Sequence, residues 1–322
     1  MKAIVQDRYG SADVLGAEDV ALPAIGDDDV LVRVVAAGVD RGAWHFMTGQ
    51  PYLMRILGFG FRAPKSRVPG TNIAGRVDAV GKNVTRFQVG DEVYGTCKGA
   101  FAEYACAHQD KLAPKPAAFT FEQAAVTPYA GFAAFQALHD HGHLRATDKV
   151  LVIGASGAVG TFTVQIAKAA RAEVTGVCSG SKAELVTALG ADHVIDYTHE
   201  DFAEGGHHYD LVIDIGGRTP VSRLRRALAR QGRLVIVGGE GDRWIGGIHR
   251  QLWASILSLL VSQKLVAFVV KENAQQLQRL NEIIDAGELT TVIDRSYPMP
   301  EAADAMRYLD DPRARGRAVL IL

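Results

Sequence analysis

Residues 150–160 read VLVIGASGAVG, and this stretch decides the fold. Its apolar start predicts a buried strand, and the residues from Ala158 onward predict a helix. The loop between them has the form AxGxxG, with Ala155 where the first glycine of a GxGxxG motif would stand, followed by Gly157 and Gly160. Such a loop is informative only where a strand leads in and a helix leads out. Both conditions are met here, so the stretch predicts a phosphate-binding turn.

The alternation of a strand with a helix continues along the middle of the chain. Short apolar runs alternate with helix-like stretches about every 20–25 residues, a spacing typical of βαβ units. This pattern predicts a parallel, doubly wound Rossmann sheet covered by helices on both faces. The runs lie at 150–154, 173–178, 193–197, 210–217 and 233–239.

The ends of the chain differ from its middle. Short strand-like segments separated by Gly, Pro and Asp turns predict an antiparallel β domain at the N-terminus, and the segment 111–123 has the composition of a boundary. The last strands resemble the first, so the chain is expected to return to its N-terminal domain. We therefore predict an α/β protein with a β domain formed by 1–120 and 290–322, and a dinucleotide-binding domain over 121–289.

Composition narrows the classes of function. A chain of 322 residues with a net charge of −1 fits two domains and argues against a nucleic-acid-binding surface. The first ten residues, MKAIVQDRYG, lack the apolar core of a signal peptide. The longest apolar run, 252–270, is interrupted by Gln263 and Lys264, so it predicts a buried helix and a strand rather than a membrane span. Three unevenly spaced cysteines fit a reducing compartment, and we expect a cytoplasmic protein.

The residues after the second strand indicate which dinucleotide binds. An NAD site carries Asp or Glu there to hold the ribose hydroxyls. This chain has Ser179, Ser181 and Lys182 instead, two hydroxyls and an ammonium that suit a 2′-phosphate. The sequence therefore favours NADPH over NADH as the cofactor.

With these motifs in view, the chain resembles the medium-chain dehydrogenase/reductase superfamily, and within it the zinc-free quinone oxidoreductase-like branch. The resemblance covers essentially the whole chain. It implies a GroES-like β-barrel catalytic domain built from both chain ends, a Rossmann domain between them, and hydride transfer from the nicotinamide. The segments that carry it are 69–95, 99–107, 126–138, 154–160 and 189–197.

The resemblance also implies roles for particular residues toward NADPH. The pyrophosphate would lie on the glycine loop, the 2′-phosphate and ribose on the next two strand ends, and the nicotinamide on later strand ends. The expected cofactor-binding residues are Ser156, Gly157, Ala158 and Val159 at the pyrophosphate, Ser179, Ser181, Lys182 and Tyr197 at the phosphate and ribose, Thr127, Gly216, Gly238 and Gly239 near the nicotinamide, and Arg317 near the cofactor.

Missing metal ligands decide the expected chemistry. Zinc alcohol dehydrogenases of this superfamily carry a cysteine and a GHE motif where this chain has Asp40 and Gly70-Thr71-Asn72. Tetrahedral zinc needs several N or S ligands, so we expect no metal site. Without a metal to polarise an alkoxide, reduction of a conjugated acceptor is favoured over alcohol oxidation.

The expected substrate is a small apolar carbonyl compound or a quinone. A proton must accompany the hydride, and Tyr52 and Asp40 are the candidate catalytic donors, with His45 as a further option. The apolar and basic segment 51–68 either forms a wall of the substrate pocket or packs on its own domain or at a subunit contact.

Other functions stay open at this stage. An enoyl-thioester reductase would use the basic residues of 55–67 for a carrier, and a non-catalytic NADPH-binding sensor or structural protein would bind without transferring hydride. The strand KLVAFVV, Lys264–Val270, is apolar throughout, which is a liability at an exposed sheet edge. A homodimer through this strand is therefore expected.

Overall fold

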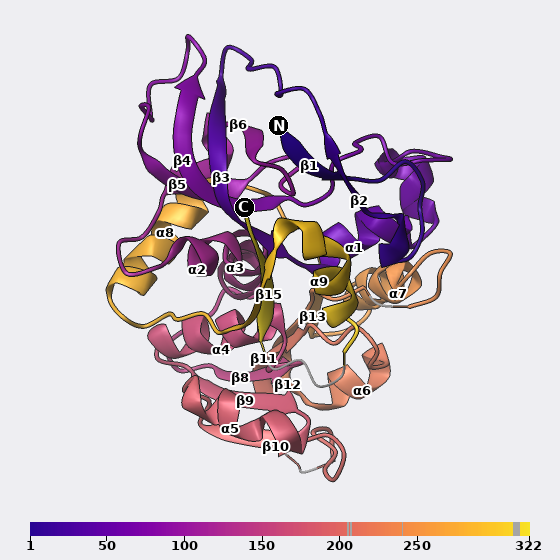
Figure 1. Ribbon diagram of the computed structural model, residues 1–322. Helices are drawn as coiled ribbons and strands as arrows, with labels where there is room; N and C mark the ends of the chain where they lie inside the picture. The colour runs from indigo at the N-terminus through magenta and orange to yellow at the C-terminus, as the bar shows by residue number, and fades with distance from the viewer. Residues whose placement is uncertain (205, 207, 240, 312–315) are drawn as a thin grey trace. The chain divides into compact units, whose positions relative to one another are not determined.

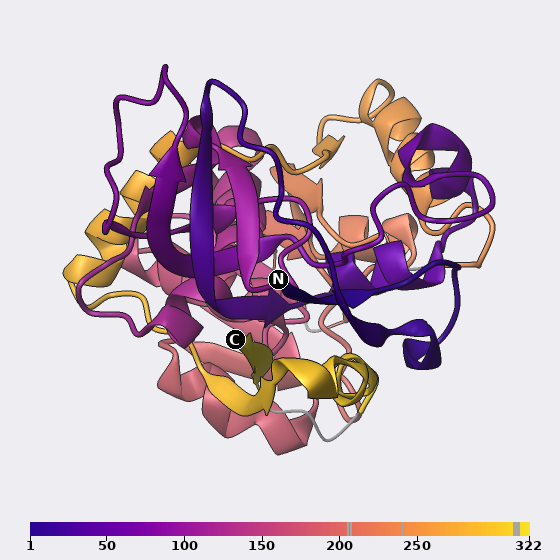
Figure 2. The same ribbon diagram turned by 45° about the horizontal axis from the view of Figure 1, so that its top comes forward.

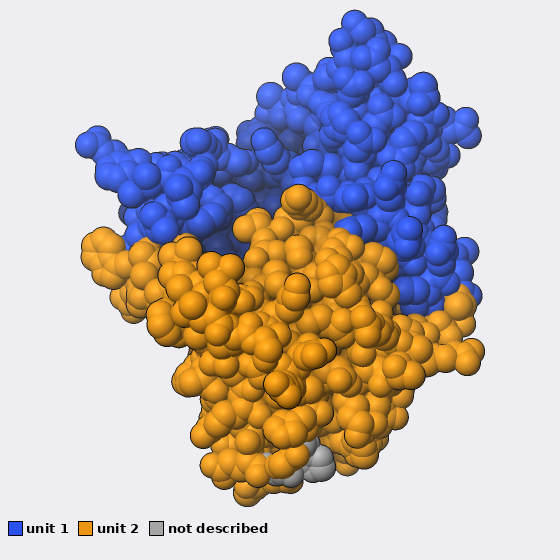
Figure 3. Space-filling view, turned by 180° about the vertical axis from the view of Figure 1, so that it is seen from behind, with its two compact units in different colours: residues 1–129, 272–285, 291–322 blue, residues 130–271, 286–290 orange. Residues whose placement is uncertain are grey.

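The chain divides into two compact units (Figure 3). The computed structural model describes residues 1–204, 206, 208–239, 241–311 and 316–322. Unit 1 comprises residues 1–129, 272–285 and 291–322, and unit 2 comprises residues 130–271 and 286–290. Both ends of the chain, marked N and C in Figures 1 and 2, belong to unit 1 by its residue ranges.

Unit 2 is built on a six-stranded parallel sheet with the order β10-β9-β8-β11-β12-β13. The order reverses between β8 and β11, and right-handed crossovers then place α4 and α5 on the opposite face from α6 and α7. The elements of this unit are β8 Lys149–Ile153, α4 Ala158–Ala169, β9 Glu173–Cys178, α5 Ala183–Ala188, β10 His193–Asp196, β11 Tyr209–Asp214, α6 Val221–Arg226, β12 Leu228–Ile236, α7 Ile248–Ser258 and β13 Lys264–Ala267.

The central strands of this sheet are apolar because helices cover both faces. Leu151, Val212 and Leu234 are fully buried and belong to one cluster with Leu224 and Ala254 of the covering helices. A strand buried on both sides cannot alternate apolar and polar residues. The continuous apolar runs of the sequence therefore predicted the sheet correctly.

Unit 1 contains a seven-stranded sheet that follows the order β14-β15-β3-β4-β5-β7, with β6 paired to β3. Its pairs are antiparallel except for β14 with β15. Strand β15 pairs with β3, so the C-terminal strand lies in the same sheet as an N-terminal strand. The elements are β1 Lys2–Val5, β2 Gly16–Asp19, β3 Asp29–Val39, α1 Arg41–Thr48, β4 Asn72–Val80, β5 Glu92–Thr96, β6 Tyr104–His108, β7 Leu112–Pro114, α2 Phe121–Ala125, α8 Ala274–Asp285, β14 Ile293–Pro298, α9 Ala302–Tyr308 and β15 Arg317–Ile321, with α3 Pro128–Phe135 beginning in this unit.

Helix α8 lies in unit 1, whereas the sequence placed residues 274–288 in the dinucleotide-binding domain of 121–289. The reason is a set of specific contacts to the β domain. The Tyr94 hydroxyl donates to the Leu277 carbonyl at 3.2 Å and is 2.7 Å from Asn281 Oδ1, and Asn281 Nδ2 donates to the Pro114 carbonyl at 3.0 Å. These contacts join segments more than 160 residues apart, which no local pattern reveals.

Helix α7 differs from the expectation of a buried helix. Trp253 is 56% exposed, and Leu259 and Leu260, directly after the helix, are 85% and 77% exposed. Only Arg250 and Ala254 of the helix are buried. The prediction was wrong because it counted apolar residues without asking which face of the helix meets the sheet. Among the described residues, no helix is long and apolar enough to cross a membrane.

Candidate functional site

The predicted cofactor residues of unit 2 share one edge of the parallel sheet. Each follows the carboxyl end of a strand: the glycine loop follows β8, Ser179 follows β9 and Tyr197 follows β10. Gly216 and Gly238 follow β11 and β12. In open α/β sheets, ligands bind outside the carboxyl ends of the strands where the strand order reverses, and β8 and β11 form such a point here.

The glycine loop has the close packing that a dinucleotide turn requires. Gly154 has a φ of +85°, and its N–H donates to the Val177 carbonyl at 3.1 Å. Gly157 is the N-cap of α4 and its N–H donates to the Gly154 carbonyl at 3.0 Å. A Cβ at Gly160 would collide with the Gly154 carbonyl oxygen, so the helix can approach the strand only with glycine there. This is the packing role predicted for the last glycine of the motif.

The N-terminus of α4 suits an anion. In the described chain no side chain caps the helix at Gly157, and first-turn N–H groups have no acceptor within a helix. Ser156 and Val159 are partly exposed, and Gly157 and Ala158 are exposed. The loop thus presents backbone donors and a positive dipole end to a phosphate.

The segment after β9 is a short 3-10 turn, Gly180–Lys182, and it lies beside the end of β10. The hydroxyls of Ser179 and Ser181 are 3.3 Å apart, and both residues keep some exposure. Tyr197 is 60% exposed, and its N–H donates to the Cys178 carbonyl at 3.2 Å. The residues expected at the 2′-phosphate and ribose are therefore neighbours.

A carboxylate that the sequence analysis overlooked stands at the same place. Asp196 ends β10 beside the turn, and a Cβ on Gly180 would collide with its Oδ2. Asp196 Oδ1 accepts from the Thr198 N–H at 3.0 Å and from its hydroxyl at 2.7 Å. These hydrogen bonds lower the pKa of Asp196, so it stays ionised. The absence of a carboxylate after β9 did not exclude one from the neighbouring strand.

The ends of β11 and β12 touch one another. A Cβ at Gly238 would collide with the Ile215 carbonyl oxygen, so the two strand ends pack backbone to backbone. Asp214, the last residue of β11, is fully buried and forms an ion pair with Arg250 of α7. Burial raises the pKa of Asp214, and the charge of Arg250 opposes this shift. Sequence reasoning missed both residues, although an arginine within an apolar helix is a signal that could have found the pair.

Two of the expected cofactor residues, Thr127 and Arg317, belong to unit 1, whereas the strand ends described above belong to unit 2. Thr127 is fully buried, and its hydroxyl donates to the Gln123 carbonyl at 2.7 Å. Arg317 is 8% exposed and donates to the Thr291 hydroxyl at 2.5 Å, and burial lowers its pKa to about 9. Both side chains thus have contacts within their own unit.

Asp40, the candidate donor, forms a hydrogen-bonded set in unit 1. Its Oδ1 caps α1 by accepting from the Ala43 N–H at 2.8 Å, and its Oδ2 accepts from Asn72 Nδ2 at 2.5 Å. Asn72 is buried, and its Oδ1 in turn accepts from the Tyr129 N–H at 3.3 Å. Loss of surrounding water raises the pKa of Asp40. Burial, followed by the negative charges of Asp40 and Glu272, raises the pKa of Tyr129 to about 12.

Tyr52, the other candidate donor, lines a pocket of about 510 Å³ in unit 1. The Arg55 guanidinium lies over the Tyr52 ring and over the Tyr9 ring, at 4.6 Å and 4.3 Å from the two centroids. Trp44 and Met47 of α1 line the same pocket. His45 Nδ1 is 2.7 Å from the Gln50 carbonyl oxygen.

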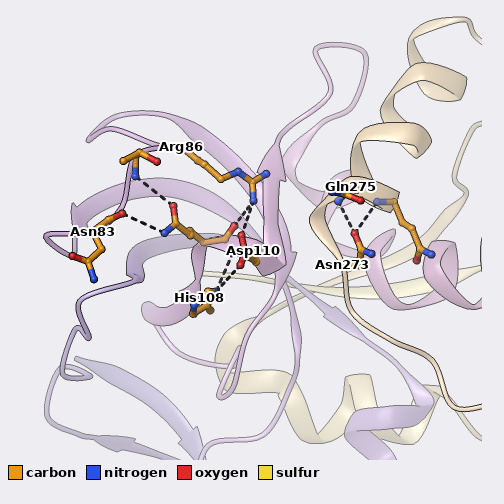
Figure 4. A network of polar contacts seen from close by, with 9 residues as sticks. Asn83, Arg86, His108, Asp110, Asn273 and Gln275 are labelled. Atoms are coloured by element: carbon orange, nitrogen blue, oxygen red, sulfur yellow. Dashed lines mark hydrogen bonds and ion pairs between the residues drawn. The ribbon is translucent and has the colours of Figure 1, made fainter.

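A polar network lies elsewhere in unit 1 (Figure 4). Arg86 donates to the Gln109 carbonyl at 3.0 Å and to Asp110 at 3.3 Å, and the Asp110 N–H donates to His108 Nδ1 at 3.2 Å. Arg86 and Asp110 also line an open hollow of about 570 Å³ with Asn273 and Gln275. None of the predicted site residues belongs to it. Across the described ranges, no three His, Cys, Asp or Glu side chains gather as a metal site would require.

Comparison with known proteins identifies the family. Residues 26–117 match the alcohol dehydrogenase GroES-like domain, and residues 189–320 match the zinc-binding dehydrogenase family. The NADPH-dependent alkenal/one oxidoreductase of Arabidopsis thaliana chloroplasts is 32% identical over 99% of this chain and 79% of its own length. The 2-methylene-furan-3-one reductase of Solanum lycopersicum is 31% identical with the same coverage. The chain belongs to the medium-chain dehydrogenase/reductase superfamily.

Within this superfamily the chain falls in the quinone oxidoreductase-like branch. The structure of Escherichia coli quinone oxidoreductase complexed with NADPH superposes with a TM-score of 0.85 at 26% identity, covering 100% of both chains. The expected fold class is confirmed: unit 1 carries the GroES-like domain and unit 2 the Rossmann sheet. Asp40 and Asn72, the residues that the sequence resemblance compares with metal ligands of zinc dehydrogenases, are joined by a hydrogen bond.

Proposed function

We propose that this chain is a zinc-independent, NADPH-dependent reductase that transfers hydride to a quinone or to an α,β-unsaturated carbonyl compound. The observation that carries the proposal is the line of strand ends in unit 2. Along the carboxyl edge of the sheet, the hydroxyl-rich turn after β9, the glycine turn after β8, and the glycines after β11 and β12 stand at neighbouring strands, and the strand order reverses between β8 and β11. The names of the relatives, an alkenal/one oxidoreductase and a furanone reductase, agree with the acceptor class.

In this proposal the residues of unit 2 hold successive parts of the cofactor. The glycine loop and the first turn of α4 would hold the pyrophosphate, and Ser179, Ser181 and Lys182 the 2′-phosphate. Gly216, Gly238 and Gly239 leave the backbone bare where a flat ring would lie. When bound, NADPH supplies the hydride.

The acceptor explains why a metal is unnecessary in this proposal. A quinone or an enone spreads the arriving negative charge over its own conjugated system, so the protein needs to align the reactants and exclude water. The Asp40–Asn72 pair supports this reading, because an amide N–H is a hydrogen-bond donor and cannot ligate zinc. Zinc would have to displace a hydrogen bond of 2.5 Å.

The proton source is a phenol of unit 1 or water. Both oxygens of Asp40 accept hydrogen bonds, so Asp40 orients its neighbours rather than giving up a proton. Tyr129, 38% exposed, has its backbone fixed by Asn72 beside Asp40, and it joins Tyr52 as a candidate donor. Phenols are protonated at neutral pH, as a proton donor must be.

A homodimer and a cytoplasmic location complete the proposal. Strand β13 ends the sheet order of unit 2, and the residues around it expose Val269, Leu259 and Leu260. A terminal strand flanked by exposed apolar side chains invites pairing with a second strand. A second copy of the chain would cover it.

Turnover of NADPH against a panel of acceptors tests the function. Quinones, alkenals, enones and enoyl-CoA esters are offered with NADPH or NADH, with and without a zinc chelator. We expect NADPH to be consumed with quinones or enones, unaffected by the chelator. NADPH binding without consumption would instead establish the non-catalytic function, and a loss of turnover with the chelator would contradict zinc independence.

Two of the cations that an enoyl-thioester reductase would use are already engaged. Arg67 donates to Asp7 at 2.6 Å and to Glu18 at 3.0 Å, and Arg55 lies over two tyrosine rings. We therefore expect enoyl-CoA esters to be poorer substrates than free enones. A higher kcat/KM for the thioesters would assign the chain to that second class.

A further inference from the structure

A buried arginine in unit 2 joins three segments that the sequence keeps apart. Arg250, on the first turn of α7, forms an ion pair with Asp214 at the end of β11. It also donates to the Thr219 carbonyl at 2.8 Å and to the Gly238 carbonyl at 2.9 Å. Arg250 is 8% exposed and Asp214 is fully buried. One side chain thus holds the loop after β11, the loop after β12 and the start of α7.

The contacts of Arg250 lie at one half of the expected cofactor site. The strand ends after β9 and β10 carry the residues expected at the adenosine half of the cofactor, and those after β11 and β12 carry the residues expected at the nicotinamide half. Among the described strand ends, the hydrogen bonds of Arg250 go to those after β11 and β12. Asp214 also holds the loop after β11, because it accepts from the Gly217 N–H at 3.4 Å.

The chemistry of the contacts requires an arginine. A guanidinium presents several N–H donors in a rigid plane and can therefore serve a carboxylate and two carbonyls at once, whereas an ammonium is a single point. Burying a charge pair costs free energy, and apolar residues of similar volume often stabilise a fold as well or better. Within the described chain the Nε of Arg250 is buried without an acceptor, so the residue is not fully satisfied by the fold. A group maintained at such cost is a candidate for a functional role.

We propose that Arg250, held by Asp214, is the positioning residue that fixes the nicotinamide half of the cofactor site while leaving the adenosine half unaffected. This inference rests on the proposed function, because it assigns the nicotinamide to the ends of β11 and β12. Arg250 does not need to touch the cofactor. It sets the spacing of the two loops whose backbones would face the ring.

The test compares two ligands that share the adenosine half. NADPH carries the nicotinamide, and 2′,5′-ADP carries only the 2′-phosphate and adenosine. Dissociation constants of both ligands are measured by calorimetry for the wild type and for Arg250→Lys. This variant keeps the positive charge opposite Asp214 but loses the planar set of guanidinium N–H donors. We expect the Kd for NADPH to rise about tenfold, the size of one lost charge-assisted hydrogen bond, with the Kd for 2′,5′-ADP within about twofold.

Two further variants keep the test decisive. His249→Gln changes the exposed neighbour of Arg250 on α7, and both dissociation constants should match the wild type. Asp214→Asn removes the charge partner while keeping the shape, and it should raise the Kd for NADPH selectively, in the same direction as Arg250→Lys. If Arg250→Lys does not fold, the ratio of the two constants in Asp214→Asn decides the question.

The outcomes separate this inference from the proposed function. Wild-type affinity for NADPH in Arg250→Lys, or equal weakening of NADPH and 2′,5′-ADP, would overturn the positioning role. A wild-type chain that binds neither ligand would overturn the proposed cofactor and the inference together. A wild-type chain that binds both but reduces no acceptor would overturn the reductase alone, and the selective loss in Arg250→Lys would still support the positioning role.

Discussion

Asn72 Nδ2 donates to Asp40 Oδ2 at 2.5 Å, and Asn72 Oδ1 accepts from the Tyr129 N–H at 3.3 Å. The buried side-chain amide of Asn72, the first residue of β4, thereby connects the N-cap of α1 with the first turn of α3. Asp40, Asn72 and Tyr129 thus form one hydrogen-bonded set in unit 1.

Asp40→Asn should change how stability depends on pH. Because desolvation raises the pKa of folded Asp40, the native state binds a proton more tightly than the unfolded chain does. Its contribution to the free energy of unfolding is therefore largest below the ordinary Asp pKa and is lost as pH rises through the raised value. We expect the stability of the wild type relative to Asp40→Asn to fall by on the order of 1 kcal/mol from pH 3 to pH 7. Urea denaturation across that range measures it, and a difference that grows with pH would refute the assignment.

Tyr129→Phe should distinguish a proton donor from a wall of the site. A reduced quinone takes its proton from water readily, whereas the enolate left by an enone needs one delivered. We expect the kcat for an enone to fall at least about tenfold and the kcat for a quinone to change little. Tyr52→Phe is the matched comparison, because the Tyr52 ring lies over Arg55. A larger loss in Tyr52→Phe than in Tyr129→Phe would move the role to Tyr52.

The turn after β9 should set the choice between NADPH and NADH. Lys182→Ala removes the ammonium, and we expect the KM for NADPH to rise about tenfold with the KM for NADH nearly unchanged. Asp196→Asn removes the carboxylate beside the turn and should lower the KM for NADPH a few-fold, because the repulsion of a phosphate is relieved. Steady-state kinetics with both cofactors measure these ratios. If Lys182→Ala affected NADPH and NADH equally, Lys182 would not contact the phosphate.

Gly160→Ala should destabilise unit 2 and weaken the cofactor site. The added Cβ would collide with the Gly154 carbonyl oxygen, and overpacking of this kind costs about 1–3 kcal/mol. Gly16→Ala is the control, since nothing lies within 4 Å of a Cβ there. Thermal unfolding of the two variants measures the difference. Equal melting temperatures would show that α4 can move away from β8 without cost.

Val269→Lys should separate the proposed dimer without unfolding the chain. Val269 is 86% exposed just beyond β13, so a lysine costs little in the monomer but places a charge in an apolar contact between copies. Val89→Lys alters a 65% exposed valine of unit 1 and should leave the assembly intact. Sedimentation at micromolar concentration measures both. A wild type that sediments as a monomer would remove the dimer from the proposal.

The local features of the chain were predictable because their physics is local. The glycine turn and the apolar strands each follow from spacing within one or two elements. Gly160, for example, was recognisable from its place three residues after Gly157, and the structure gives it the expected close packing.

What the sequence missed depends on topology. Asp196 reaches the turn after β9 only because β10 pairs beside β9, and Arg250 meets Asp214 across 36 residues of chain. The exposed face of α7 and the contacts of Tyr94 with α8 depend in the same way on where an element docks. The residue type alone marked some of these positions, such as an arginine in an apolar helix, but the residues that they contact are known only from the folded structure.

Hydride transfer itself is the central claim, and isotope transfer tests it most directly. The protein is incubated with an enone and with NADPH that carries deuterium at the transferable position of the nicotinamide. We predict that the saturated ketone acquires one deuterium at the carbon β to the carbonyl, as read by mass spectrometry. Tight binding of NADPH with no deuterated product from any enone, and no reduced quinone, would contradict the account.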